Sequence, residues 1–435
     1  MTDPAAPQHP NTPQHTPVRV LHIGDLHLGV ELYGRPDPEK GYGTRVGDFL
    51  RALDSALEHA EDADLVLFPG DIYKNCDPGP TVQREFAARI RKTARTTPVA
   101  VIPGNHDVPN MAGRASSVDI FRVLELENVH VFRQPEVQAV PTRAGTVLVA
   151  PLPFMPRSRL VAQEEARGKG IAEVLEMMRE RLVTFVHNLA ESVKEQRARL
   201  GEGTPAVLMA HYTIQGAVFG GYGKGALLAP EVELPLGQIR DETFDYVALA
   251  HIHKHQSIPP RDHSGQPPVV YAGSIERVDF SEEDEEKVVV MAEVRRGCTT
   301  WNPVPLHPRP FVTIRVAADE VDPLESVKAA VERKREQLEG AVVRLLYTLP
   351  PGLPNLPERE LRQALEGAAY VAAIRREVPP REARGRVGAL TTQLTPIEAL
   401  DEYLKTQPKL EPMREDLLQR AAALVGELET ETEAA

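Results

Sequence analysis

The chain has 435 residues, 42% of them hydrophobic and 26% charged, a composition typical of a globular protein with one large core and room for smaller units. No run of 18 or more apolar residues occurs, which argues against a membrane span. The formal net charge of −13 excludes binding to nucleic acid through a uniformly basic surface, so any DNA contact needs local basic patches, metal ions or a partner.

The N-terminal segment is rich in Pro, Gln, Thr and His and lacks an apolar core. We expect a disordered tail over residues 1–17, and neither a signal peptide nor a strand. Only two cysteines occur, Cys76 and Cys298, and they have no CxxC spacing. They suit a reducing cytoplasm and argue against a disulfide scaffold or a zinc ribbon.

Between residues 18 and 285, apolar runs alternate with amphipathic stretches, a pattern typical of an α/β sheet protein. The expected strands cover residues 18–25, 63–71, 98–107, 146–153, 206–211 and 244–253. Helical spacing of apolar residues predicts helices over 47–62, 81–96 and about 170–199.

After residue 285, Pro-rich joints separate shorter units, and we interpret 286–380 as a second, small α/β domain. Its expected strands are 311–318, 341–349 and 370–378, with helices near 322–338 and 357–366. Residues 381–435 are predicted to be a linker and two amphipathic helices, the first with Thr395 as its N-cap and Pro396 at its first position. The pattern leaves open whether these helices fold back on the second domain or bind a partner.

Polar side chains suited to a metal lie at the ends of five of the expected strands. They are Asp25 and His27, Asp71 in "GD", the "NHD" of residues 105–107, His211, and His251 with His253. Because the carboxyl ends of strands in an open α/β sheet meet at one edge, we expect these groups to lie together. With His106 set aside, two carboxylates, one amide and four imidazoles make seven ligands, which suits two metals that share a carboxylate.

Mixed nitrogen and oxygen ligands without thiolate favour Mn²⁺, Fe²⁺ or Zn²⁺ over Ca²⁺ or Mg²⁺. Two such cations about 3.5–4 Å apart can activate water and hold a phosphate ester in line. Each motif alone has a simpler interpretation, since "GD" is usually a turn and "HIHKH" an exposed strand end. Together, in this order and each at a strand end, they predict a dimetal phosphoester hydrolase.

The series D-x-H, GD, GNHD, H and H-x-H resembles the calcineurin-like metallophosphoesterases. The longer segments "HIGDLHLG", "PGNHD", "AHYTIQG", "AHIHKHQ" and "YAGSIERVDFSEEDEEK" are similar to those of SbcD-type nucleases, bacterial members of the meiotic-recombination-eleven family of DNA double-strand-break repair nucleases. The resemblance covers about residues 18–290 strongly. It implies a layered β-sandwich flanked by helices over 18–285, a small α/β capping domain over 286–380 and a C-terminal helical region that binds a partner.

The resemblance also implies a role for each residue of the series. One metal would be held by Asp25, His27, Asp71 and His253. The other would be held by Asn105, His211 and His251, with Asp71 bridging the two. His106 would contact the scissile phosphate and help to protonate the leaving 3′-oxygen, and Asp107 would buttress a neighbouring histidine. His255 is expected to be a surface residue that binds no metal.

Two positions depart from the family pattern. Many relatives have a histidine a few residues after "GD", where this chain has Lys74, so we expect a phosphate contact there and not proton transfer. The family's "GHIH" is "AHIH" here, and Ala250 is tolerable if the backbone at this position has a negative φ. Neither change removes a ligand.

The function implied by the resemblance is a DNA nuclease with two Mn²⁺ per chain, Fe²⁺ or Zn²⁺ being alternatives. It would degrade duplex DNA from 3′ to 5′, cleave single strands or hairpins, and act as a homodimer with an SbcC-type coiled-coil ATPase at the nucleoid in the bacterial cytoplasm. The Gly-rich segment 216–230 lacks GxxxxGK[ST], so the chain has no nucleotide motor of its own. Two alternatives remain: a small-molecule or cyclic-nucleotide phosphodiesterase on the same scaffold, and a mainly structural tether of DNA ends.

Overall fold

The computed structural model describes residues 16–111, 113–221, 231–258, 266–377, 396–405 and 413–422. Most of the predicted tail, the linker after residue 380 and the glycine-rich residues 222–230 lie outside these ranges. The chain divides into two compact units. The first comprises Met1–Ile314, Lys328–Leu345 and Pro357–Ile374, and the second Arg315–Val327, Leu346–Leu356 and Arg375–Ala435.

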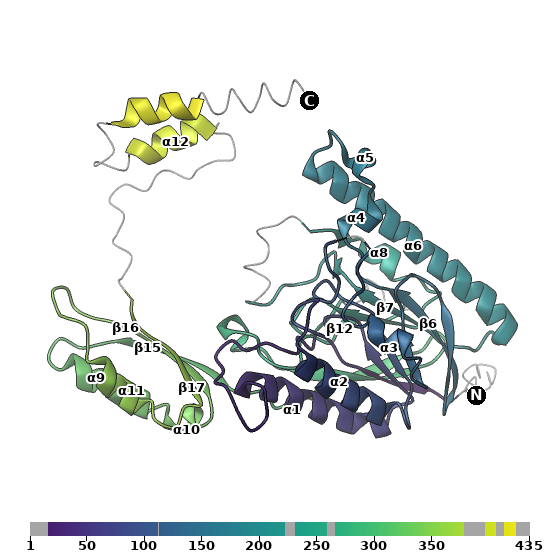
Figure 1. Cartoon of the computed structure of the whole chain (residues 1–435), viewed down its shortest axis with the longest axis horizontal. Helices are drawn as coiled ribbons and strands as arrows, with labels where there is room; N and C mark the ends of the chain where they lie inside the picture. The colour runs from purple at the N-terminus through teal and green to yellow at the C-terminus, as the bar shows by residue number, and fades with distance from the viewer. Residues whose placement is uncertain are drawn as a thin grey trace, which may run out of the picture. The chain divides into compact units, whose positions relative to one another are not determined.

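Two six-stranded sheets form the centre of the first unit (Figure 1). The first sheet has the order β14-β13-β1-β2-β3-β4, in which β1 to β4 run parallel and β13 is antiparallel to both of its neighbours, β1 and β14. Its strands are β1 (Val18–His22), β2 (Leu65–Phe68), β3 (Val99–Val101), β4 (Val129–Val131), β13 (Val288–Val294) and β14 (Thr300–Pro305).

The second sheet has the order β11-β12-β10-β7-β6-β5, with the four inner strands parallel. Its strands are β5 (Gln138–Thr142), β6 (Gly145–Leu152), β7 (Ala206–His211), β10 (Tyr246–Ala250), β11 (Gln256–Ile258) and β12 (Val269–Tyr271). A short parallel pair, β8 (Thr213–Ile214) and β9 (Glu233–Leu234), lies beyond β7 in the chain.

The sheets pack face to face through a mainly apolar layer. Val20 and Leu67 from the first sheet and Val149, Val207 and Ala248 from the second belong to one buried cluster. The outer face of each sheet is buried by helices, which is why the central strands are continuous apolar runs and do not alternate. The predicted layered β-sandwich flanked by helices is therefore confirmed.

The long helices match the predicted ones closely. Helices α1 (Thr44–Glu58) and α2 (Pro80–Thr93) contribute Phe49 and Phe86 to the core cluster of the first sheet. Helix α6 (Ile171–Leu200) contributes Leu182 and Val186 to that of the second. Shorter helical elements are η1 (His59–Glu61), α3 (Asp119–Val123), α4 (Arg157–Leu160), α5 (Gln163–Ala166), α8 (Leu236–Ile239) and η2 (Phe280–Glu282).

A three-stranded sheet follows, in the order β15-β16-β17. It consists of β15 (Phe311–Ala317), β16 (Val342–Thr348) and β17 (Tyr370–Arg376), with helices α9 (Pro323–Glu332), α10 (Arg335–Leu338) and α11 (Glu358–Ala364) between the strands. The predicted boundary at residue 285 precedes β13 and β14, which pair in the first sheet, and the division into domains stays a prediction.

The C-terminal region contains α12 (Pro396–Lys405) and a helical segment over 413–422. The proposed N-cap Thr395 lies outside the described residues. No helix in the described ranges combines the length and apolar character that a membrane crossing needs.

Candidate dimetal centre

The predicted ligands lie in loops just after β1, β2, β3 and β10 and at the last residue of β7. Strands β1 and β2 each end three residues before their aspartate, earlier than the sequence pattern suggested. The chain turns sharply in these loops, because His27, Asp71 and His251 have φ values of +44°, +51° and +97°. Such left-handed conformations are costly for residues other than glycine and cluster at functional sites.

Two glycines allow these loops to approach one another closely. A Cβ atom on Gly70 would lie 2.3 Å from Nδ1 of His211, and one on Gly104 would lie 2.2 Å from Oδ1 of Asp71. Real Cβ atoms are essentially never found at such distances, so any side chain here would displace a predicted ligand.

The first group of donors contains Asp25, His27 and His253, whose ligand atoms all lie within 4.8 Å of one another. The Nε2 atoms of His27 and His253 are 2.8 Å apart. Oδ2 of Asp25 is buried and has no hydrogen-bond partner in the described structure. Burial and the neighbouring His253 lower the pKa of His27 well below its usual value, so its ring is neutral. An orphaned carboxylate oxygen beside facing imidazole nitrogens is a fitting donor set for a divalent cation.

The second group contains Asp71, His211 and His251. The amide oxygen of Asn105 lies 2.9 Å from Nε2 of His211 and 3.0 Å from Nδ1 of His251. Oδ2 of Asp71 is 3.4 Å from Nε2 of His211 and 3.7 Å from Nε2 of His27. Asp71 thus lies between the two groups, where a carboxylate could bridge two cations.

Burial and mutual contact act in opposite directions on the pKa values of Asp71 and His211. Burial alone would raise the pKa of Asp71, but His211 and His27 hold it below its ordinary value. Burial likewise opposes the charge on His211, yet Asp71, Asp25 and the carbonyl of Pro69 together raise its pKa to about 9. Asp71 is therefore ionised, as a bridging ligand must be.

Two further carboxylates orient the histidines of the H-x-H motif. The sequence pattern predicted neither of them. Oε1 of Glu282 lies 2.6 Å from Nδ1 of His253, and Oε1 of Glu231 lies 2.7 Å from Nε2 of His251. Burial would raise the pKa of Glu282, but the buried Lys287 at 2.9 Å and His253 lower it to about 2. Each carboxylate accepts from one ring nitrogen and leaves the other free to bind a metal.

Asp107 does not buttress a histidine, contrary to the prediction. Its carboxylate accepts hydrogen bonds from the backbone N–H groups of Ile72, Tyr73 and Gly104 at 3.0–3.1 Å, and from the hydroxyl of Ser117 at 2.9 Å. Burial and the charge of Asp71 raise its pKa to about 6. Asp107 therefore joins the "GD" loop to the "GNHD" loop, and it positions Asp71 and Asn105 through the backbone.

His106 lies beside both donor groups. Its backbone N–H donates to Oδ1 of Asp71 at 2.9 Å, and its ring contacts that of His27 edge to face with 4.8 Å between centroids. Its Nδ1 is 2.9 Å from the backbone carbonyl oxygen of the exposed Lys74. The Nε2 atom of His106 is thereby left for a substrate.

The remaining two expectations for this region have opposite outcomes. Ala250 ends β10 and is absent from the residues of positive φ, so its methyl group is accommodated as predicted. His255 is half-buried, with Nδ1 2.8 Å from the carbonyl oxygen of Tyr271 and its ring against Trp301. The expectation of a surface histidine is wrong, because Trp301 on β14 covers the ring.

The chain belongs to the calcineurin-like phosphoesterases, whose family model matches residues 18–255. Together with the two donor groups, this membership defines it as a dimetal phosphodiester hydrolase. The chain is similar to the SbcD component of the SbcCD nuclease of Rhodobacter capsulatus, with 26% identity over 82% of this chain and 86% of that protein.

It is also similar to the SbcD component of the Escherichia coli K12 nuclease, with 25% identity over 64% of this chain and 66% of that protein. A third relative is the DNA double-strand break repair protein Mre11 of Archaeoglobus fulgidus, with 23% identity over 71% of this chain and 63% of that protein. The resemblance to SbcD-type nucleases that the motifs predicted is confirmed.

Proposed function

We propose that this chain is a Mn²⁺-dependent DNA nuclease that degrades duplex ends from 3′ to 5′ and cleaves single strands and hairpins during repair of double-strand breaks. The observation that carries the proposal is the position of His106 beside two metal-capable donor groups, with Asp71 lying between them. The names of the relatives, SbcCD nuclease and double-strand break repair protein, support DNA as the substrate.

In this proposal one cation is held by Asp25, His27 and His253. The other is held by Asn105, His211 and His251, and Asp71 binds both cations. When bound, the two cations would supply an activated water molecule and offset the charge of the phosphodiester. The donors combine imidazole, carboxylate and amide, and neither Cys76 nor Cys298 belongs to a donor group, which favours Mn²⁺ with Fe²⁺ or Zn²⁺ as substitutes.

The chain's own contribution to the reaction is positioning and proton transfer. The Lys74 carbonyl fixes the ring of His106 by accepting from Nδ1–H, so that Nε2 faces the substrate. Once Nε2 has taken up a second proton, the imidazolium can give that proton to the leaving 3′-oxygen and returns to the neutral ring. The side chain of Lys74 lies on the same exposed loop and would contact a neighbouring phosphate. Asp107 holds the two loops that carry Asp71 and Asn105.

The proposal extends to partners. Helix α3 exposes Ile120 and Val123, with 51% and 70% of their surface accessible, and Leu124 beside it is 59% accessible. An apolar patch of this kind supports a homodimer contact. We further propose that the C-terminal helices bind an SbcC-type ATPase, that the three-stranded sheet helps to select the form of DNA, and that the complex works at the nucleoid in the bacterial cytoplasm.

The test is cleavage of 5′-labelled duplex DNA by the purified chain with Mn²⁺ and then with Mg²⁺. His106→Ala should retain both metals and lose cleavage, and Asp71→Ala should lose the metals and cleavage together. Hydrolysis of bis-p-nitrophenyl phosphate without any DNA cleavage, even with the ATPase and ATP present, would instead favour a phosphodiesterase of small substrates.

A further inference from the structure

Among the exposed arginines of the first unit that have no ion-pair partner in the described residues, five line neighbouring depressions. They are Arg114, Arg122, Arg157, Arg159 and Arg167. The neighbouring Arg181 behaves differently, since it pairs with Glu165. In a chain with a net charge of −13, unpaired cations gathered in one region favour an anionic ligand.

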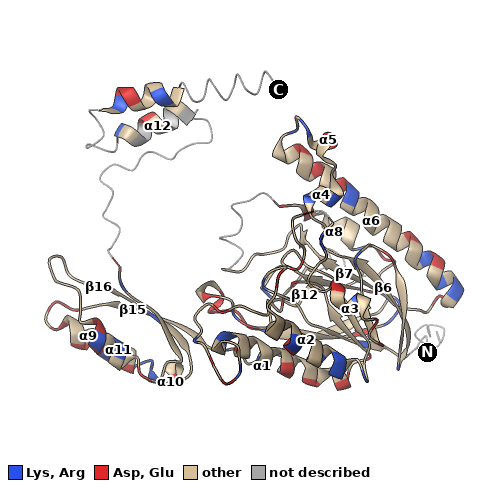
Figure 2. Cartoon of the chain, viewed as in Figure 1, with Lys and Arg blue, Asp and Glu red and all other residues tan. Residues whose placement is uncertain are grey.

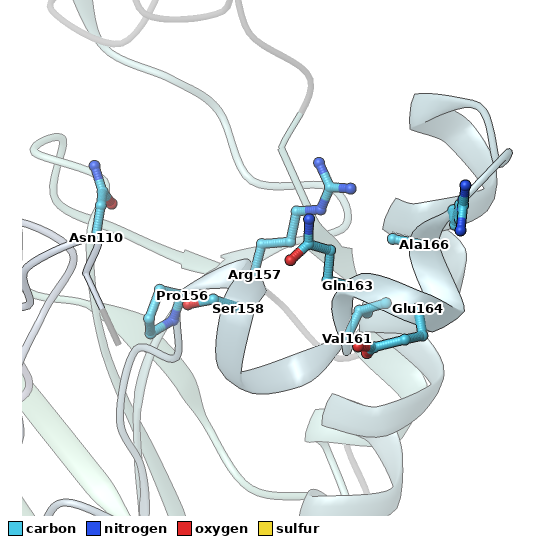
Figure 3. Close-up of a pocket in the computed structure, with 9 residues that line it drawn as sticks. Asn110, Pro156, Arg157, Ser158, Val161, Gln163, Glu164 and Ala166 are labelled. Carbon is cyan, nitrogen blue, oxygen red and sulfur yellow. The ribbon is translucent and has the colours of Figure 1, made fainter. Parts of the chain in front are cut away.

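These arginines line three adjoining depressions. Arg157 and Arg167 line the widest, of about 1180 Å³, whose lining also includes Asn110, and the Arg157 side chain lies beside that of Gln163 (Figure 3). Arg114 and Arg159 line the second, and Arg122 and Arg159 the third. Pro156 is common to the first two depressions, and Arg133 and Arg159 to the last two, so the three adjoin one another, the middle one being small at about 20 Å³.

The arginine track, as we call these three depressions, adjoins a cavity that borders the dimetal centre. Arg157 also lines a neighbouring cavity of about 380 Å³ whose walls include His211 and His251. The charged residues of α4 are both basic, whereas α6 carries both signs along its length (Figure 2). Two acidic residues, Glu136 and Glu164, line the track as well, and Arg133 is paired with Asp119, so the excess of positive charge comes from the five unpaired arginines.

We propose that the arginine track binds the phosphate backbone of duplex DNA and leads it to the metal centre; this inference rests on the nuclease function proposed above. Guanidinium groups match phosphate geometry and stay charged at any physiological pH. Sites for single strands combine basic grooves with aromatic stacking platforms. Phe132 is the one aromatic residue among the described lining residues of the track, and it is buried, so the track contacts phosphates and does not stack bases.

The experiment measures binding of the full-length chain to a fluorescent 30-base-pair duplex at several salt concentrations, with EDTA to prevent cleavage. The track variant is Arg114→Gln/Arg122→Gln/Arg159→Gln. The control variant, Arg91→Gln/Arg199→Gln/Arg95→Gln, removes the same charge from exposed arginines elsewhere that also have no ion pair in the described chain. Melting temperature and Mn²⁺ affinity, measured for both, report whether the fold is kept.

Each lost phosphate contact should reduce the magnitude of the negative slope of log K against log salt by about 0.9. For the track variant this magnitude should therefore fall by about 2–3, and its affinity for DNA should fall at least about tenfold. The control variant should stay within about twofold of the wild type. Equal losses in the two variants would overturn the track while leaving the nuclease proposal intact. A wild-type chain that neither binds nor cleaves DNA would instead overturn the nuclease proposal. If the triple variant melts early, Arg159→Gln alone should still lower the slope by about 1.

Discussion

The Nδ1 atom of His106 lies 2.9 Å from the backbone carbonyl oxygen of Lys74. A carbonyl can only accept a hydrogen bond, so Nδ1 carries the proton and Nε2 is free for the substrate. The contact that orients His106 therefore comes from the main chain of residue 74 and does not depend on its side chain.

Replacing Lys74 by alanine should consequently leave the chemical step nearly intact. We expect Lys74→Ala to raise KM for DNA and change kcat by less than about threefold, whereas His106→Ala should lower kcat by about 10²–10⁴ because a general acid is lost. Steady-state kinetics on duplex DNA, with Mn²⁺ affinity measured in parallel, separate the two effects. An equal loss of kcat in both variants would mean that the ammonium group of Lys74 itself takes part in the reaction.

The contact between Glu282 and His253 leads to a second prediction. Since the carboxylate accepts from Nδ1 at 2.6 Å, it fixes the ring and makes Nε2 a better ligand. Glu282→Gln should weaken Mn²⁺ binding by about 10–100-fold, as measured by calorimetry. Glu231→Gln should have a smaller effect, because the side chain of Glu231 is 41% exposed. Unchanged Mn²⁺ affinity in Glu282→Gln would show that this carboxylate serves only to neutralise Lys287.

The ligand types could be predicted because each lies just after an apolar strand or at its end, and parallel strands bring their carboxyl ends together. Asp25, Asp71 and His211 are of this kind, and the structure places all three in or beside the donor groups. Finding polar side chains at or just after the carboxyl ends of apolar strands needs only a periodicity argument. That Asp25 and Asp71 follow strands of one sheet while His211 ends a strand of the other could not be predicted in this way.

The supporting carboxylates could not be predicted in this way. Glu282 contacts a histidine 29 positions away, and Asp107 contacts backbone groups 34 and 35 positions away. Nothing in the local pattern distinguishes Glu282 from the other acidic residues of "SEEDEEK". Its role follows from the burial of η2 against the H-x-H loop, which is a property of the packed sandwich.

Gly104 provides a third prediction, about the close approach of two loops. Gly104→Ala would place a methyl group 2.2 Å from Oδ1 of Asp71 and 2.4 Å from its backbone nitrogen. We expect loss of Mn²⁺ binding and of DNA cleavage, with circular dichroism showing a retained fold. Gly237→Ala is the matched control, because no atom lies within 4 Å of the added carbon. Full activity of Gly104→Ala would disprove the proposed placement of Asp71.

The last prediction concerns His22, which is fully buried between the two sheets. Its Nδ1 accepts from the hydroxyl of Tyr246 and its Nε2 donates to the carbonyl of Leu249, both at 3.1 Å. Burial lowers its pKa to about 3, from 6.5 in the unfolded chain. Below pH 6.5 the unfolded chain therefore binds a proton that the folded chain does not, so the free energy of unfolding falls as the pH drops from 6.5 toward 3.

The contribution of one such group is about 1.4 kcal/mol per pH unit, or about 2 kcal/mol between pH 6.5 and 5.0. His22→Gln should be less stable than the wild type at pH 7.5, because packing is disturbed. Between pH 6.5 and 5.0, however, its free energy of unfolding should fall by about 2 kcal/mol less than that of the wild type. Urea unfolding in EDTA at pH 7.5, 6.5 and 5.0 measures both quantities. His187→Gln, at an exposed position on α6, should follow the wild-type curve. If the free energy of unfolding fell equally with pH in His22→Gln and the wild type, His22 would be protonated in the folded chain as well, and this prediction would be wrong.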